Sequence, residues 1–230
     1  MPRANRVCPG GIVYHALNRG NQRDRVFDGP GDYAALEGVL AESVELVGMR
    51  LLAYAVLPNH WHMLLYPRGD GDLPRFMHHL TTTHVRRWRL HRHSVGEGHV
   101  YQGTYKSFPV ARDEHFLSVA RYIERNPLRA GLVAAGQAAA WRWSSLWRRV
   151  YGTPEQQSLL SPWPVDQPGN WVQRVNQPQT QVELEALRLC VRRGRPYGPD
   201  RWVARTAEAL GLGFTLRDRG RPKKERAGAG

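Results

Sequence analysis

The apolar positions of the first half of the chain alternate between two spacings. Residues 12–17 (IVYHAL), 51–57 (LLAYAVL) and 60–66 (HWHMLLY) are short apolar runs bounded by turn-forming residues, a pattern that predicts strands. Apolar residues recur at helical spacing from Asp32 onward and again over residues 72–91. We take Asp32 as the cap of its helix, because a carboxylate can accept the free N–H groups of a first turn.

Two further elements follow at residues 100–110 and 113–126. The first, VYQGTYKSFPV, predicts a strand, and the second predicts a helix that Asp113 caps and Pro127 stops. The resulting order is β-α-β-β-α-β-α. It predicts an α+β fold, a ferredoxin-like antiparallel sheet with helices packed on one face.

The pattern changes after residue 147. Residues 152–180 combine five prolines with many glutamines and predict a loop or linker. Two short helices are predicted at residues 182–191 and 200–210. We therefore divide the chain into a domain over residues 1–150, a Pro/Gln-rich linker over 151–180, and a small basic extension over 181–230 that is mainly helical or disordered.

The net charge of the chain indicates its binding partner. The chain has 33 Lys and Arg against 20 Asp and Glu, a net charge of +13, and an isoelectric point near 10.5. Residues 188–230 hold 12 basic and 4 acidic residues, a net of +8. Such a surplus attracts polyanions, although it is also typical of a merely soluble, arginine-rich protein. We expect nucleic acid as the partner.

Several classes of protein are excluded by composition. No apolar run approaches the roughly 20 residues of a bilayer span, and no basic amphipathic helix suggests a membrane anchor. The first residues lack the apolar core of a signal peptide. Cys8 and Cys190 form neither a disulfide framework nor a zinc pattern. We expect a cytoplasmic, nucleoid-associated protein.

The first candidate for chemistry is the pair His60 and His62. Side chains alternate along a strand, so both imidazoles project from one face, roughly 7 Å apart. At that distance two imidazoles can share a metal ion, while Trp61, Met63 and Leu65 point to the opposite face. The alternative is a pair of hydrogen-bonded histidines on a half-buried strand.

The second candidate lies on the helix over residues 113–126. Tyr122 and Asn126 are one turn apart at the edge of its apolar stripe. A tyrosine there can simply pack, and an asparagine before proline can simply end a helix. If the helix packs on the face of His60 and His62, however, Asn126 completes a three-ligand site. Oxygen and imidazole ligands with open positions suit Mg²⁺ or Mn²⁺, and Tyr122 beside them is a candidate nucleophile.

Three blocks of sequence carry a resemblance to a known family. AYAVLPNHWHMLLYP, GHVYQGTYKSF and LSVARYIERNPLRAGLV, the last followed by WSS, occur in the order and spacing of the single-tyrosine HUH transposases, the IS200-like transposases. The match covers residues 11–145. The resemblance implies that His60 and His62 bind the metal, that Tyr122 is the nucleophile, and that Asn126 is the third ligand. It also implies a cleavage product with a 5′-phosphotyrosine and a free 3′-OH.

One branch of that family fits best. Mobile members more often have glutamine at the position of Asn126, whereas asparagine resembles the REP-associated tyrosine transposases. These act on repetitive extragenic palindromes, and their C-terminal extension is similar to residues 195–224 here. The resemblance therefore implies single-stranded or hairpin DNA as the substrate. Mobile relatives are dimers, and the long extension could make this chain a monomer, so both a monomer and a homodimer stay open.

Candidate DNA contacts come from two basic segments and one lysine. Residues 84–93 (HVRRWRLHRH) include Arg86 and Arg87, which can bind phosphates, and Trp88, which can stack on a base; a solvated basic face is the alternative. Lys106 belongs to a family block. The tail resembles an AT-hook that enters a minor groove, unless it is an ordinary basic tail; its candidate contacts are Arg219, Arg221, Lys223 and Lys224.

The leading prediction is metal-dependent cleavage and rejoining of DNA. Two other functions stay open at this point. One is a protein that recognises palindromic repeats without cutting them. The other is a metal-dependent hydrolase in which Tyr122 only packs.

Overall fold

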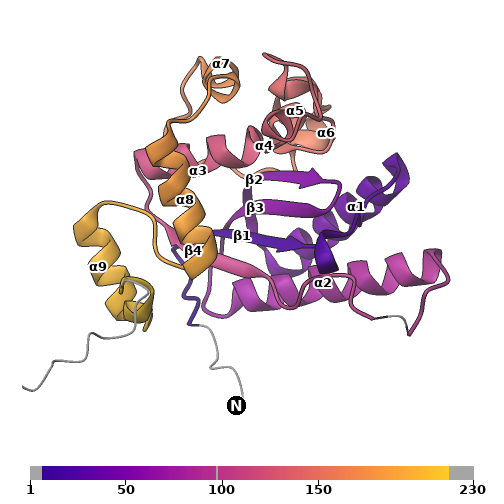
Figure 1. The fold of residues 1–230 in the computed structure, drawn as a ribbon, viewed down its shortest axis with the longest axis horizontal. Helices are drawn as coiled ribbons and strands as arrows, with labels where there is room; N and C mark the ends of the chain where they lie inside the picture. The colour runs from indigo at the N-terminus through magenta and orange to yellow at the C-terminus, as the bar shows by residue number, and fades with distance from the viewer. Residues whose placement is uncertain (1–6, 97, 218–230) are drawn as a thin grey trace, which may run out of the picture.

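The structure is a computed structural model that describes residues 7–96 and 98–217. A four-stranded antiparallel sheet with the order β2-β3-β1-β4 forms its centre (Figure 1). The strands are β1 (Val13–Arg19), β2 (Arg50–Leu57), β3 (His60–Tyr66) and β4 (Lys106–Val110). This order, with β1 inside the sheet, confirms the predicted ferredoxin-like α+β fold.

Helices α1 (Pro30–Val47) and α2 (Asp72–His91) lie side by side on one face of the sheet (Figure 1). Their buried leucines and phenylalanine pack against Trp61, Met63 and Leu65 of β3, so the predicted face of that strand is confirmed. The predicted cap Asp32 is wrong by three residues. Gly29 is the N-cap, and the Asp32 carboxylate, in the first turn, accepts the N–H groups of Asp28 and Gly29 at 2.8 and 3.2 Å.

The opposite face is covered by α3 (Glu114–Glu124), with later helices packed around it. The prediction that the helices pack on one face is therefore wrong, because Phe116, Val119 and Ile123 of α3 bury a second apolar layer against the sheet. Asp113 caps α3 as predicted, accepting the His115 N–H at 2.9 Å. Pro127 does not end the helical path, because α4 (Asn126–Arg129) follows after the single residue Arg125. Proline is tolerated in the first turn of a helix, where its missing N–H has no partner to lose. Tyr122 and Asn126 therefore flank an interruption and not an end.

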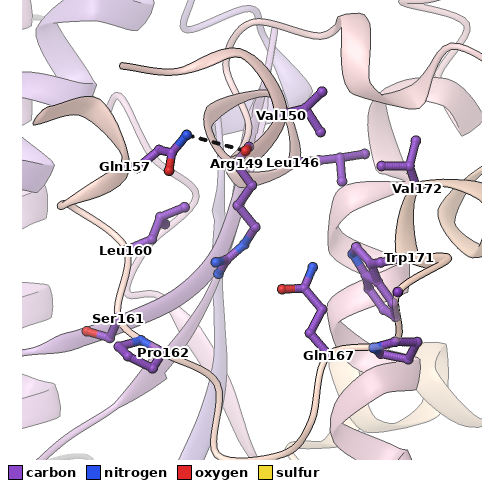
Figure 2. A pocket seen from close by; sticks show the side chains of 12 residues that line it. Leu146, Arg149, Val150, Gln157, Leu160, Ser161, Pro162, Gln167, Trp171 and Val172 are labelled. Carbon is purple, nitrogen blue, oxygen red and sulfur yellow. Dashed lines mark hydrogen bonds between the residues drawn. The ribbon is translucent and has the colours of Figure 1, made fainter. Parts of the chain in front are cut away.

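The segment predicted as a linker is folded onto this second face. It contains α6 (Pro154–Gln157) and α7 (Trp171–Asn176). The Trp163 indole donates to the Leu52 carbonyl at 2.7 Å, and the Trp171 indole donates to the Glu124 carboxylate at 2.6 Å. Between this segment and α5 (Ser145–Tyr151) lies a cavity of about 590 Å³, into which Arg149 extends (Figure 2). The domain boundaries stay a prediction, but residues 152–180 are no loose connection.

The remaining elements follow the sequence pattern with one exception. The two helices of the extension are α8 (Gln181–Arg193) and α9 (Asp200–Ala209), as predicted. Strand β4 is shorter than predicted, because Tyr101 bridges Gly20 instead of continuing the ladder. Three 3₁₀ turns complete the description: Asn21–Arg23, Ala138–Ala140 and Gly213–Thr215. Within the described residues, no helix is both long and apolar enough to span a membrane.

Candidate functional site

The two histidines of β3 project from one face, as their spacing predicted, and that is the face on which α3 packs. His62 pairs with Leu17 of β1 and Ala55 of β2, and both histidines lie on the side of the sheet that Phe116 and Val119 of α3 cover. Their ring centroids are 5.1 Å apart, and the two ring planes are nearly perpendicular. The strand thus presents two imidazoles to one small volume.

His60 is held in one tautomer by its neighbour. The Asn59 amide nitrogen donates to the Arg23 carbonyl at 3.1 Å, so the amide oxygen is left as an acceptor. That oxygen lies 2.6 Å from Nδ1 of His60, which must therefore donate. In the neutral ring the lone pair is then on Nε2. A histidine whose second nitrogen donates to a fixed acceptor is the usual arrangement of a metal ligand.

His62 has a corresponding partner that the sequence did not single out. Nδ1 of His62 lies 2.9 Å from Nε2 of His15 on β1, and the two rings are stacked with centroids 5.0 Å apart. One nitrogen of this pair donates to the other. When His62 donates, its own Nε2 is free to bind a cation, and His15 is the acceptor that fixes the ring.

Burial keeps these imidazoles neutral. It lowers the pKa of His60 to about 4, with Arg19 and Arg129 adding to the effect. Burial also lowers the pKa of His15 to about 3 and holds that of His62 well below its ordinary value, where His15, His60 and the two arginines contribute. Neutral imidazole is the form that binds metals.

Tyr122 stands over the histidines. It is 6% exposed, and its ring centroid lies 5.7 Å from that of His62 and 6.2 Å from that of His15, edge-on to both. Its hydroxyl makes no hydrogen bond within residues 7–96 and 98–217. The predicted juxtaposition of Tyr122 with the histidine pair is thus present in the structure.

Asn126 and Arg129 complete the group. Asn126 is buried, and its Oδ1 accepts from Nη2 of Arg129 at 3.0 Å, while its Nδ2 has no partner among the described residues. The Arg129 guanidinium also lies 4.5 Å above the ring of Tyr122. The unpaired Nδ2 is an N–H donor and calls for an acceptor, whereas a cation would bind Oδ1, the atom that accepts from Arg129. The Nε2 atoms of His60 and His62 and the Oδ1 of Asn126 are a donor set that fits a divalent cation with open positions, provided that His62 donates from Nδ1 to His15.

A second group of possible ligands lies at the far end of α3. Asp113, Glu114 and His115 bring their ligand atoms within 4.8 Å of one another, the one such trio of His, Cys, Asp or Glu among the described residues. Asp113 already caps the helix and accepts from His115, whose ring stacks edge-on to Tyr197. Nine residues of helix, roughly 13 Å, separate it from Tyr122. It is a helix cap apart from the predicted site.

The predicted DNA contacts are dispersed. Arg86 and Arg87 are exposed on α2, across the sheet from Tyr122, and Arg87 forms a bidentate ion pair with Glu42 at 2.8 and 2.9 Å. Trp88 packs on the core and donates to the Val26 carbonyl at 2.7 Å, and the Arg92 guanidinium lies 4.5 Å over its ring, so one face of the ring is already occupied. Lys106 is exposed at the start of β4. The four tail residues lie outside the described residues: Arg219, Arg221, Lys223 and Lys224.

Three residues of the site were missed from the sequence: His15, Arg19 and Arg129. His15 lies two residues after Val13 on the strand, so the two side chains are expected on the same face. That His15 contacts His62, however, depends on the register of β1 against β3. Arg129 lies one turn after Asn126 on α4. That spacing was available, although nothing in it revealed the contact with Tyr122.

Comparison with known proteins identifies the class of this protein. The fold and the histidine–tyrosine group occur together in a chain whose residues 10–126, about half its length, match the family model "Transposase IS200 like". The chain therefore belongs to the IS200-like transposases, a family of DNA-cleaving enzymes. No curated protein matches it.

Two solved structures are similar to this chain. One is a REP-associated tyrosine transposase bound to a REP hairpin, with a TM-score of 0.49 and 19% identity, covering 73% of this chain and 93% of that one. The other is described as a possible transposase of Deinococcus radiodurans, with a TM-score of 0.37 and 21% identity over 54% and 93% of the two chains. No residue role here rests on either.

Proposed function

We propose that this protein cleaves and rejoins single-stranded or hairpin DNA with Tyr122 as nucleophile, using Mg²⁺ or Mn²⁺ held by His60, His62 and Asn126. The observation that carries the proposal is the placement of Tyr122 against His62, whose ring lies 5.1 Å from that of His60, with burial keeping both imidazoles neutral. A tyrosine hydroxyl without a hydrogen-bond partner among the described residues, beside a candidate cation site, is the arrangement that covalent phosphoryl transfer needs.

The reaction exchanges one phosphoester bond for another, so it needs no external energy source. The Tyr122 oxygen forms a bond to phosphorus, the bond from phosphorus to the 3′ oxygen breaks, and the phenolic proton leaves while the departing oxygen gains one. The products are a 5′-phosphotyrosine and a 3′-hydroxyl. In the reverse step a 3′-hydroxyl attacks and the phenolate leaves, so rejoining uses the same residues.

Each neighbouring side chain has a defined part. Asn59 holds His60 with Nε2 free, and His15 fixes the ring of His62, whose Nε2 is free when its Nδ1 donates to His15. Arg129 keeps a positive charge against the ring of Tyr122, where it stabilises the phenolate that leaves during rejoining. A cation held by His60, His62 and Asn126 would neutralise charge at the phosphate. His15 thus acts through His62 and is a positioning residue.

The substrate class follows from charge and from the identity of Asn126. The net charge of +13 suits a polyanion. Asparagine at the position of the third ligand makes this chain similar to the branch of the family that acts on repetitive extragenic palindromes. We propose such palindromes as the target and the nucleoid as the place of action. Lys106, Arg86, Arg87 and the basic tail stay predicted DNA contacts.

The test is covalent trapping. The full chain is incubated with Mn²⁺ and labelled hairpin oligonucleotides copied from short palindromes that flank its gene, and the products are separated on a denaturing gel. We expect a band at the mass of protein plus DNA, absent after EDTA and restored by Mn²⁺. Binding without cleavage would support the palindrome-binding alternative. Cleavage without an adduct would make water the nucleophile and support the hydrolase.

A further inference from the structure

A groove of about 850 Å³ opens beside the nucleophile. One side is formed by Arg19 at the end of β1 and by Tyr122 and Arg129. The other side is α8, which contributes residues between Gln181 and Arg192. Because the family match ends at residue 126, the α8 wall belongs to the part of the chain beyond the matched region.

The wall is fixed to the helix that carries Tyr122. Leu187 and Cys190 of α8 are buried in the core that α3 shares. At the start of α8, Glu183 pairs with Arg121 of α3 at 3.0 Å, and Gln179 just before it donates to the Ser118 carbonyl at 3.2 Å. Since α8 is anchored to α3 by apolar and polar contacts, the groove is a built feature and keeps its width at Tyr122.

The groove is strongly basic. Arg19, Arg129, Arg188 and Arg192 line it against a single carboxylate, Glu185. Within the described parts of the chain none of the four arginines forms an ion pair, whereas Arg87, Arg92, Arg121, Arg142 and Arg148 elsewhere all do. Unneutralised guanidinium groups along one groove favour a phosphate backbone.

The spacing on α8 suits one strand. Arg188 and Arg192 are both exposed and four residues apart, so they project from one side of the helix about 6 Å apart along its axis. The groove leads to one tyrosine that is 6% exposed. A single backbone can reach that hydroxyl, while a duplex would be held off by the walls.

We infer that α8 guides the single DNA strand to Tyr122, with Arg188 and Arg192 binding neighbouring phosphates of that strand. This inference rests on the proposed function and assigns a role to a helix outside the matched family region. It places the entry of the substrate strand between α8 and the end of β1. The remaining arginines, Arg19 and Arg129, then receive the phosphates nearest the site of attack.

The experiment measures binding separately from cleavage. In a Tyr122→Phe background, which cannot form the adduct, the affinity for a labelled, unstructured oligothymidine is measured over a range of salt concentrations. The double variant Arg188→Gln/Arg192→Gln removes the groove pair. A matched control, Arg201→Gln/Arg205→Gln, removes an exposed pair of the same spacing on α9 that lines none of the cavities described here.

We expect the groove variant to bind about 10-fold more weakly at 0.1 M salt. Its slope of log affinity against log salt should fall by about 1.4, because each phosphate contact on a single strand contributes about 0.7. The control should change both values little, and equal thermal unfolding of the two variants shows that neither change acts through folding. Equal losses of affinity in the two variants would overturn the inference.

The two proposals fail in different ways. A covalent adduct on the wild type together with unchanged binding by the groove variant would reject the role of α8 and keep the proposed chemistry. No adduct on the wild type together with the expected loss of binding would keep α8 as a DNA contact and reject the chemistry.

Discussion

A histidine and a tyrosine meet in the interior on each side of the sheet, and the two pairs differ in their hydrogen bonds. On the α1/α2 side, the Tyr101 oxygen lies 2.9 Å from Nδ1 of His84 and accepts from the Trp61 indole at 3.2 Å. On the α3 side, Tyr122 packs on His62 with no hydrogen bond between them. Tyr101 and Tyr122 are equally buried, each 6% exposed.

The difference separates a structural pair from a reactive one. A buried polar atom without a partner costs roughly 1–3 kcal/mol, so folding favours closed sets such as that of Tyr101. On the α3 side the buried Nδ2 of Asn126 has no partner among the described residues, and the Tyr122 ring packs on His62 without a hydrogen bond to it. Residue type and the exposed fraction of the whole residue are the same on both sides, and the hydrogen bonds of the two hydroxyl groups differ.

The largest expected effect comes from exchanging the two tyrosines for phenylalanine. Tyr122→Phe removes a hydroxyl without a described partner, so the adduct should vanish to background while the free energy of unfolding hardly changes. Tyr101→Phe leaves Trp61 and His84 without their partner, so stability should fall by about 1–3 kcal/mol while the adduct persists. Denaturing gels and urea unfolding measure the two effects. Loss of the adduct in Tyr101→Phe and its persistence in Tyr122→Phe would show that Tyr122 is not the nucleophile.

Next in size is the loss of a histidine ligand. His60→Ala or His62→Ala should abolish the adduct. Either change should also weaken Mn²⁺ binding, measured by titration calorimetry, by at least about 10²-fold, because the cation loses a side chain that binds it directly. His84→Ala should leave Mn²⁺ affinity unchanged and lower stability instead. Undiminished cleavage by the His60→Ala/His62→Ala double variant would remove the metal from the account.

A smaller effect is expected from the residue behind His62. His15→Phe removes the acceptor for Nδ1 of His62, and loss of such outer partners typically lowers metal affinity 10- to 100-fold. His15→Gln keeps an acceptor and should retain most of the affinity. Nitrogen NMR of His62 should show Nδ1 protonated in the wild type and mixed tautomers in His15→Phe. Equal affinities for all three proteins would mean that His15 only fills space.

Asn126→Ala should be milder still. One of three ligands is lost, and water can take its place, so we expect a several-fold drop in Mn²⁺ affinity and in the rate of adduct formation. Higher Mn²⁺ concentration should restore the rate. A loss as complete as that of Tyr122→Phe would give Asn126 a role beyond binding the cation.

A separate effect, on stability and not on cleavage, concerns acid pH, and both sides contribute to it. Burial lowers the pKa of His84 to about 4, from an ordinary 6.5. Its contribution to stability is therefore complete above pH 6.5 and is lost as the pH falls from 6.5 toward 4, by about 3 kcal/mol at most. His84→Gln should flatten the fall of unfolding free energy over that window. An unchanged slope would show that His84 is not buried as a neutral ring.

Local pattern predicted the elements that carry the site, and long-range contacts decided the rest. Strand His60–Tyr66 and helix Asp72–His91 have the predicted bounds because their apolar spacing is regular. The partners of Trp163 and Trp171 are Leu52 and Glu124, far away in sequence, so no local signal showed that the predicted linker is packed.

The site divides in the same way. His60, His62, Tyr122 and Asn126 came from spacing and from the family resemblance. His15 depends on the register between β1 and β3, and Arg129 on a side-chain contact across α3 and α4. Arg86 and Arg87 were predicted from charge alone, which does not show on which side of the sheet a helix lies.

The most direct measurement of the central claim is the chemical position of the adduct. Wild-type protein is trapped on the labelled hairpin with Mn²⁺, digested, and analysed by mass spectrometry. The account predicts a single modified peptide, the one that carries Tyr122, joined to a 5′ phosphate. An adduct on Tyr101 or any other residue, or a link to a 3′ phosphate, would contradict it.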